Sequence, residues 1–405
     1  MAEILDIEGA RELIQMCHAG RLYEIERWIA EGRSLDISTA CKRGRSLTLL
    51  EVAVENGFHS LVELIAKNEP SKHTKTAALV LAVSSRRMDL IELLCANGAD
   101  PKTVPLDTVL FEWEPKLIRY FLDRGAEAVE GRPFAEAFRE RIRTALRAFI
   151  DYKRAHPELG PQLQEQIDCA LRSFCGEGDL KWVCLLLWAG ADARSRGPCL
   201  GKDWTEDPDC YTTGLEEACR PESIDILKKL KPDRKRDNVA VLLRNAAMWS
   251  RSATLEYLLE LGFDPNDKTN GGSSALDMVL RHLDFVQIGS SHGSGVLTAV
   301  YEVRPSLECV RSLVSHKAVW HPEDGYDLNS LRRVLVKCQP EVTIELLRLF
   351  REFNACPAET VHRLLGSPRM REHLKSQENS LRRLGIHLNA RSTKARQIGL
   401  TSDSR

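Results

Sequence analysis

A short apolar helix that stops at a glycine constrains the fold of this chain more than any other feature. Between Thr254 and Asp267, leucines recur at helical spacing, and Gly262 follows them at a position that favours left-handed backbone. The Asp-Pro-Asn-Asp stretch after the glycine predicts a turn that cannot continue the helix. Such a unit cannot bury its apolar face alone, so we expect neighbours of the same kind. The leucines expected on the buried face are Leu255, Leu258, Leu259 and Leu261.

Segments of the same form recur along the chain, at residues 25–32, 91–101, 118–126 and 184–193. An opening half also recurs, because Ser46–Phe58 leads directly into Leu61–Ile65. On these residues the chain resembles the ankyrin repeat family, whose units of about 33 residues open with Thr-Pro-Leu-His-x-Ala. The pairs Leu50-Glu51, Leu215-Glu216 and Leu276-Asp277 replace the Leu-His pair, so the repeats are degenerate. The resemblance covers most of residues 10–355.

The resemblance implies an all-α fold, an ankyrin-like helical solenoid of about eight to ten units with an irregular central insertion and long loops. We expect Phe134–Tyr152 to form one long amphipathic helix within the insertion. The basic end of the chain is expected to be frayed. The predicted segments are 1–127 (ankyrin-like repeats), 128–165 (a helical insertion or enlarged unit), 166–370 (repeats with long loops) and 371–405 (a basic, flexible tail).

Composition and charge exclude several classes of protein. The 405 residues carry a net charge of -1, so no global field directs the chain to nucleic acid or membrane. No apolar run is long enough for a transmembrane helix, and the N-terminus lacks the pattern of a secretion signal. Twelve scattered cysteines without a Cys-x-x-Cys pair indicate reduced thiols and a cytoplasmic protein. We find no nucleotide-binding, metalloprotease or hydrolase motif, and we expect no metal and no cofactor.

The most distinctive loop contains acids that alternate with aromatics. A calcium site is disfavoured there, because Pro208 interrupts the loop and a closing bidentate Glu is missing. Contact with a partner protein is one interpretation, since Trp and Tyr supply contact area and acids supply register. An ordered loop whose Trp204 covers the end of the core is the equally weighted alternative. The candidate partner-binding residues of this loop are Asp203, Trp204, Asp207, Asp209 and Tyr211.

The turns after the glycines form a second candidate surface, because stacking would place them along one rim. The family resemblance implies that residues there point along one edge. For the aspartates of these turns, the competing explanation is that each side chain bonds its own backbone. The aspartates concerned are Asp100, Asp192 and Asp264. The candidate partner-binding residues of the rim are Lys102, Arg194, Asn266 and Lys268.

The sequence therefore favours a non-enzymatic interaction scaffold that binds a partner protein through its concave face and long loops, as an inhibitor of a toxin or enzyme or as an effector. One alternative is an enzyme whose site lies in the insertions at 128–165 or 284–305, where shifted ionisable groups would converge on a pocket. Another is nucleic-acid binding through the basic tail and the run 228–236.

Overall fold

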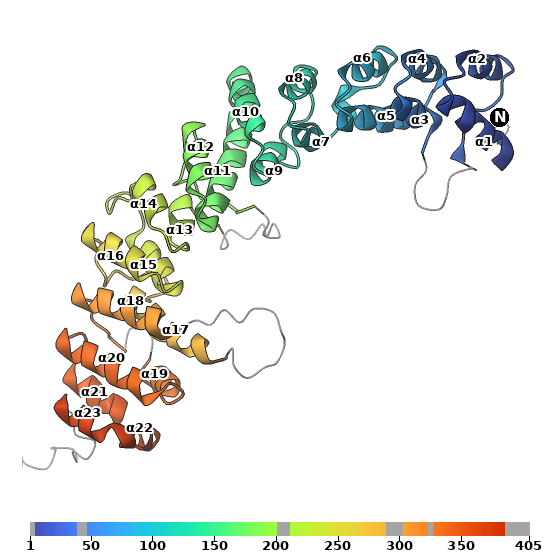
Figure 1. The fold of residues 1–405 in the computed structure, drawn as a ribbon. Coiled ribbons are helices and arrows are strands. Elements are labelled where there is room, and N and C mark those ends of the chain that lie inside the picture. Colours follow the sequence, from blue (N-terminus) through green and yellow to red (C-terminus); the bar gives the residue numbers. More distant parts are fainter. Residues whose placement is uncertain (1–4, 39–46, 201–210, 289–302, 323–326, 385–405) are drawn as a thin grey trace, which may run out of the picture. The chain divides into compact units, whose positions relative to one another are not determined.

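The computed structural model describes residues 5–38, 47–200, 211–288, 303–322 and 327–384. The chain divides into two compact units. Within the described ranges, the first holds residues 5–171, 185–191 and 197–200, and the second holds residues 172–184, 192–196, 211–288, 303–322 and 327–384. Each unit consists of short helices joined by turns, so the predicted all-α, ankyrin-like helical solenoid is confirmed (Figure 1).

The first unit stacks its helices in two layers. The contacts α1–α3, α3–α5, α5–α7 and α7–α9 join the first helices of successive pairs, and α2–α4, α4–α6 and α8–α10 join the second helices (Figure 1). Each pair cannot exclude water from both of its faces, so the next pair completes its core. The helices of this unit are α1 (Ile7–His18), α2 (Leu22–Ala30), α3 (Leu49–Asn56), α4 (His59–Asn68), α5 (Lys72–Ser84), α6 (Met88–Ala96), η2 (Pro101–Thr103), α7 (Leu106–Phe111), α8 (Pro115–Asp123), α9 (Pro133–Arg139), α10 (Arg143–Ala155) and η3 (Pro157–Leu159).

The second unit repeats this arrangement, with the contacts α13–α15, α15–α17 and α17–α19 in one layer and α16–α18 and α18–α20 in the other. Helices α11 (Gly160–Glu177) and α12 (Leu180–Trp188) each contribute residues to both units. The remaining helices are α13 (Gly214–Glu217), α14 (Asp225–Leu230), α15 (Val239–Met248), α16 (Ser252–Glu260), α17 (Ala275–Ile288), α18 (Val303–Ser315), α19 (Leu328–Leu335), α20 (Pro340–Glu352), α21 (Ala358–Leu365), α22 (Pro368–His373), η5 (Lys375–Gln377) and α23 (Glu378–Arg383).

Side-chain caps fix where several first helices begin. The Thr48 hydroxyl accepts from the Glu51 backbone N–H, while the Glu51 carboxylate accepts from the Thr48 N–H at 2.7 Å, which is a complete capping box. Such a cap stabilises a helix by about 1 kcal/mol. Single side-chain caps begin α5, α13, α15 and α19, where the capping residues are Ser71, Thr213, Asn238 and Asp327.

Two kinds of turn recur in the described units. We call the turn between the two helices of a pair the hairpin tip, and the turn after the second helix the finger. Both kinds use a residue with positive φ, which is glycine at Gly57 and Gly262 but tryptophan at Trp113 (φ 62°) and lysine at Lys231 (φ 54°). Left-handed backbone costs a non-glycine residue about 1–2 kcal/mol, so packing must hold these turns.

Two local predictions are wrong. The stretch Phe134–Tyr152 is not one helix, because α9 ends at Arg139 and α10 begins at Arg143, with Arg141 at φ 60° between them. The Gln166 side chain then ties this pair to α11, since its amide oxygen accepts from the Phe134 N–H at 3.0 Å. Leu261 follows the end of α16 and is 42% exposed, whereas Leu255, Leu258 and Leu259 are buried.

The basic stretch expected to fray from residue 371 remains folded as far as the structure describes it. Helix α23 covers Glu378–Arg383, and the Leu374 and Leu381 side chains are completely buried. The predicted tail is therefore wrong for residues 371–384, while residues 385–405 lie outside the described ranges. The other predicted segment boundaries stay predictions.

Candidate interaction surface at the fingers

Four of the described fingers share one hydrogen-bonded turn. An aspartate carboxylate accepts from the backbone N–H two residues later, and this bond holds the chain in a tight turn. The explanation that these aspartates serve turn geometry is thus confirmed for Asp100, Asp192 and Asp264. The bonds are Lys102 N–H to Asp100 (3.0 Å), Arg194 N–H to Asp192 (2.9 Å), Lys235 N–H to Asp233 (2.9 Å) and Asn266 N–H to Asp264 (2.9 Å).

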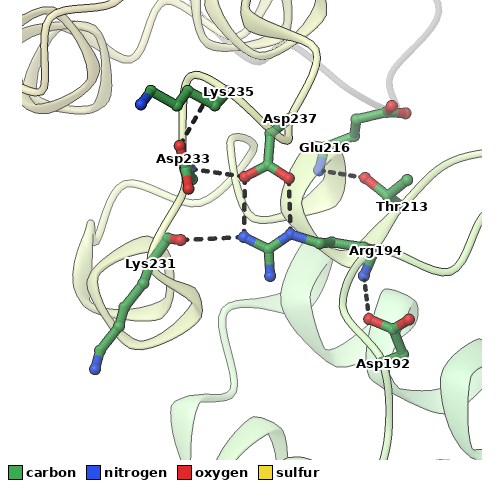
Figure 2. Close-up of polar contacts among 8 residues, drawn as sticks. All are labelled: Asp192, Arg194, Thr213, Glu216, Lys231, Asp233, Lys235 and Asp237. Atoms are coloured by element: carbon green, nitrogen blue, oxygen red, sulfur yellow. Dashed lines mark hydrogen bonds and ion pairs between the residues drawn. The ribbon is translucent and has the colours of Figure 1, made fainter.

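Arg194 is a predicted partner-binding residue. Its guanidinium group forms hydrogen bonds to the next finger of its own chain. Figure 2 shows the side chain directed at Asp237, with Nε 2.8 Å from one carboxylate oxygen and Nη2 3.0 Å from the other. Nη2 also donates to the Lys231 carbonyl at 3.2 Å. The Asp237 side chain is only 4% exposed, and it accepts in addition from the Asp233 N–H at 2.7 Å. Arg194 therefore ties two successive fingers together.

Electrostatics strengthens this tie. The hydrogen bond to the Asp237 carboxylate is the main cause that raises the pKa of Arg194 above its ordinary value. A planar guanidinium can donate two parallel bonds to one carboxylate, which a lysine in the same place cannot do. Glu216 also appears in Figure 2, where its backbone N–H donates to the Thr213 hydroxyl. Burial raises the pKa of the Glu216 carboxyl, even though Arg196 lies 3.2 Å away.

Asn266 makes the corresponding contact one finger further on. Its amide nitrogen donates to the Lys317 carbonyl at 3.1 Å, and its amide oxygen accepts from the Val319 N–H at 2.9 Å. Lys317 occupies the positive-φ position after α18, as Lys231 does after α14. The amide thus satisfies backbone groups of the next finger that the turn leaves unpaired.

Lys102 and Lys268 keep exposed side chains. The aliphatic part of the Lys102 side chain lies beside the next finger, because a Cβ added to Gly125 would be 3.2 Å from the Cε of Lys102. Lys268 lies with Asn266 and His321 at a hollow of about 260 Å³. Partial burial, with a smaller contribution from Asp264, raises the pKa of the neighbouring Asp267. These two lysines are the charged rim candidates whose side chains are exposed.

The acidic-aromatic loop is mostly outside the described ranges. Asp203, Trp204, Asp207 and Asp209 lie in residues 201–210, and only Tyr211 of this set is described, as a half-buried side chain. The role of all five in partner binding stays a prediction, as it does for the four rim residues.

A hollow of about 560 Å³ lies between α8 and α10, in the part of the chain where the enzyme hypothesis places its site. Burial raises the pKa of Tyr152 at this hollow. Arg147 and Asp151, which also line it, pair with each other at 3.1 Å and are 76% and 39% exposed. Within the described residues, no three His, Cys, Asp or Glu side chains gather as a metal site. None of the described helices is both long and apolar enough to cross a bilayer.

The sequence reasoning missed two groups of residues. Asp237 and Lys317 complete the finger contacts. The available signal for the finger that contains Asp237 was the Asp233-x-Lys235 spacing, which repeats Asp100-x-Lys102. Trp113 was missed because no glycine marks its hairpin tip. Its position between two glutamates and ahead of a proline was the available signal.

Stacked helix pairs, left-handed turns and hydrogen-bonded fingers define the described chain as an ankyrin-like repeat fold. Among solved structures, it is similar to the ankyrin repeat domain of Bcl-3, described as a unique member of the IkappaB protein family. The identity is 20%, the match covers 56% of this chain and 100% of that one, and the TM-score is 0.35. It is also similar to the human ASB11 ankyrin repeat domain, with 13% identity over 76% of this chain and 99% of that one and a TM-score of 0.26. No family model and no curated protein matches the sequence.

Proposed function

We propose that the chain is a non-enzymatic cytoplasmic scaffold that binds a partner protein through its fingers and the concave face of its repeats, and that binding inhibits or captures the partner. The observation that carries this proposal is the bonding of successive fingers to one another. Arg194 and Asn266 each satisfy groups of the next finger, so the fingers are held before any partner arrives. Preorganised contact surfaces lose less entropy on association than mobile loops do.

The exposed lysines of the rim supply the recognition in this proposal. Lys102 and Lys268 present charge from turns that the aspartates and the neighbouring units hold in place. Charged groups at a rim act mainly on the rate of association and on the choice of partner. The acidic-aromatic loop, with Trp204 and Tyr211, would add contact area of the type found at binding hot spots.

Co-purification from the native cell with the intact tagged chain tests the proposal. We expect a protein to be retained by the wild type and to be lost, in whole or large part, from a Lys102→Glu/Lys268→Glu variant and from a Trp204→Ala/Tyr211→Ala variant. Arg27→Glu is the matched control, since it reverses the charge of an exposed residue on α2, outside the fingers. A chain that retains no protein but turns over a small molecule would refute the proposal.

A further inference from the structure

The second helices of two neighbouring pairs in the first unit border a groove. We define the α8–α10 groove as the hollow of about 560 Å³ between these helices. Its apolar lining comes from Leu122, Ala148, Tyr152 and Ala155, and its charged lining includes Arg119 and Arg147 together with Asp123 and Asp151. A groove of this volume with a largely apolar lining has the size and chemistry of protein sites that bind ligands or peptide side chains.

Basic side chains dominate the exposed surface around the groove. The exposed basic residues of α8 and α10 are Lys116, Arg119, Arg143, Arg147 and Arg154, against the acids Asp123 and Asp151. Asp151 already pairs with Arg147 at 3.1 Å and lies 3.8 Å from Arg154. The lining itself is balanced, and Glu127 and Glu158 also act on the Tyr152 of the groove. Helices α8 and α10 as a whole carry a net positive charge around the apolar walls, which matches a segment with apolar side chains on one face and acids beside them.

An exposed tryptophan stands at the end of α8 that borders the groove. Trp113 lies two residues before Pro115, which begins α8 and lines the groove. Trp113 is 51% exposed, and its backbone φ is 62°. A bulky residue in left-handed backbone is strained, and such strain gathers at functional sites. The equivalent hairpin-tip position holds glycine at Gly57 and Gly178 but Arg86, Arg141 and Ser250 elsewhere, so the aromatic side chain, rather than the backbone, sets Trp113 apart among the described tips. Tryptophan is strongly enriched at binding hot spots.

We propose that the α8–α10 groove binds an acidic amphipathic helix of a partner protein, with Trp113 packing against the end of that helix. The inference rests on the proposed function and names the chemistry of a partner segment. The groove offers the Thr144 hydroxyl as well, which has no hydrogen-bond partner within the described residues. The chain's own C-terminal end does not fit, because residues 385–405 are themselves basic.

A helix fits the groove better than the other acidic surfaces. A recessed apolar groove accepts protruding side chains at i, i+3, i+4 and i+7, which is the pattern of helix-in-groove recognition. Single-stranded nucleic acid requires a run of exposed aromatic platforms for its bases, whereas the groove pairs the exposed Trp113 with one half-buried ring, Tyr152. An anionic membrane is contacted by a protruding apolar face rather than a recessed one.

The test uses the full chain and a labelled synthetic helix of about 18 residues, which is five turns, with leucine at i, i+3, i+4 and i+7 and glutamate elsewhere. Fluorescence anisotropy measures its affinity. We expect binding that weakens as salt rises, at least a tenfold loss with Arg119→Glu/Arg147→Glu, and about a thirtyfold loss, equivalent to about 2 kcal/mol, with Trp113→Gly. Arg27→Glu, on the exposed face of α2, is the matched control and should bind as the wild type does.

Several outcomes would overturn the inference. They are equal binding of a peptide with lysine in place of glutamate, equal binding by the Arg119→Glu/Arg147→Glu variant, or binding only to phosphatidylserine vesicles or to an RNA oligonucleotide. Circular dichroism of each variant confirms that it is folded, and Trp113→Gly should fold because glycine accepts the backbone of this tip. The groove and the scaffold function are tested by different outcomes. Co-purification of a partner that survives the groove substitutions refutes the groove alone, whereas peptide binding without any co-purifying protein refutes the scaffold function alone.

Discussion

Replacing Arg194 with alanine separates the two roles that this residue can have. If Arg194 ties successive fingers, the substitution destabilises the chain. If it only faces a partner, stability is unchanged. The substitution removes two bonds to Asp237, at 2.8 and 3.0 Å, and one to the Lys231 carbonyl at 3.2 Å. It also leaves the Asp237 carboxylate, which is 4% exposed, without its cation.

The magnitude follows from this burial. Removing one partner of a buried ion pair costs about 3–5 kcal/mol, since the remaining charge stays buried. The Arg194 side chain is 28% exposed, and Asp237 keeps its bond from the Asp233 N–H, so water and that bond offset part of the loss. We therefore expect Arg194→Ala to lower the free energy of unfolding by about 2–3 kcal/mol. Arg194→Lys should recover only part of this, because lysine cannot form the bidentate contact.

Urea unfolding followed by circular dichroism gives the change in stability, and hydrogen exchange of the α15 amides locates it. Lys235→Ala is the control, because this exposed residue fills the same turn position and should change stability by less than about 0.5 kcal/mol. In a double-mutant cycle with Asp237→Ala, the two changes should not add. If Arg194→Ala is as stable as the control, the reasoning from the fingers is wrong.

Three further predictions concern a turn, a carboxyl and the thiols. Gly125→Ala should lower the free energy of unfolding by about 1–2 kcal/mol, more than Gly190→Ala, because both have positive φ but a Cβ at Gly125 also meets Lys102; thermal unfolding of the two variants compares them. Because burial raises the pKa of Glu216, the folded chain binds its proton more tightly than the unfolded chain does. The unfolding free energy should therefore gain a contribution as pH falls from the raised pKa toward the ordinary value of 4.5, and Glu216→Gln should remove this contribution from urea unfolding measured across that range. Burial raises the pKa of Cys17 and Cys309 to about 12, so iodoacetamide at pH about 8 should alkylate both far more slowly in the folded chain than in urea, as mass spectrometry of the peptides would show.

The fold was predictable from the sequence where glycine marks a turn. Gly57, Gly98 and Gly262 all have positive φ, and the helices on both sides of them were expected. The prediction failed at Phe134–Tyr152, because Arg141 adopts the same backbone without being glycine. Tertiary packing decides such a turn, and periodicity alone cannot detect it, since the apolar spacing continues across the break.

The candidate surface was predictable only in part. The sequence pointed to the positions after each turn glycine, and the structure indeed places Arg194 and Asn266 in fingers. Their bonding to Asp237 and Lys317 was not predictable, because these partners lie 43 and 51 residues away along the chain. The α8–α10 groove likewise depends on how two helices pack, and a single sequence does not encode that spacing in a readable pattern.

The contacts between fingers also have a direction. In each case an earlier finger reaches a later one, from Lys102 to Gly125, from Arg194 to Lys231 and from Asn266 to Lys317. During synthesis, each of these fingers emerges before the segment that holds it, so it is fixed only when the following helix pair has folded. A truncation from the C-terminal end that removes Gly125, Lys231 or Lys317 takes away the contact of the finger before it, whereas a truncation from the N-terminal end leaves the later of these contacts in place. The chain is therefore asymmetric in how it assembles and in which end it can lose.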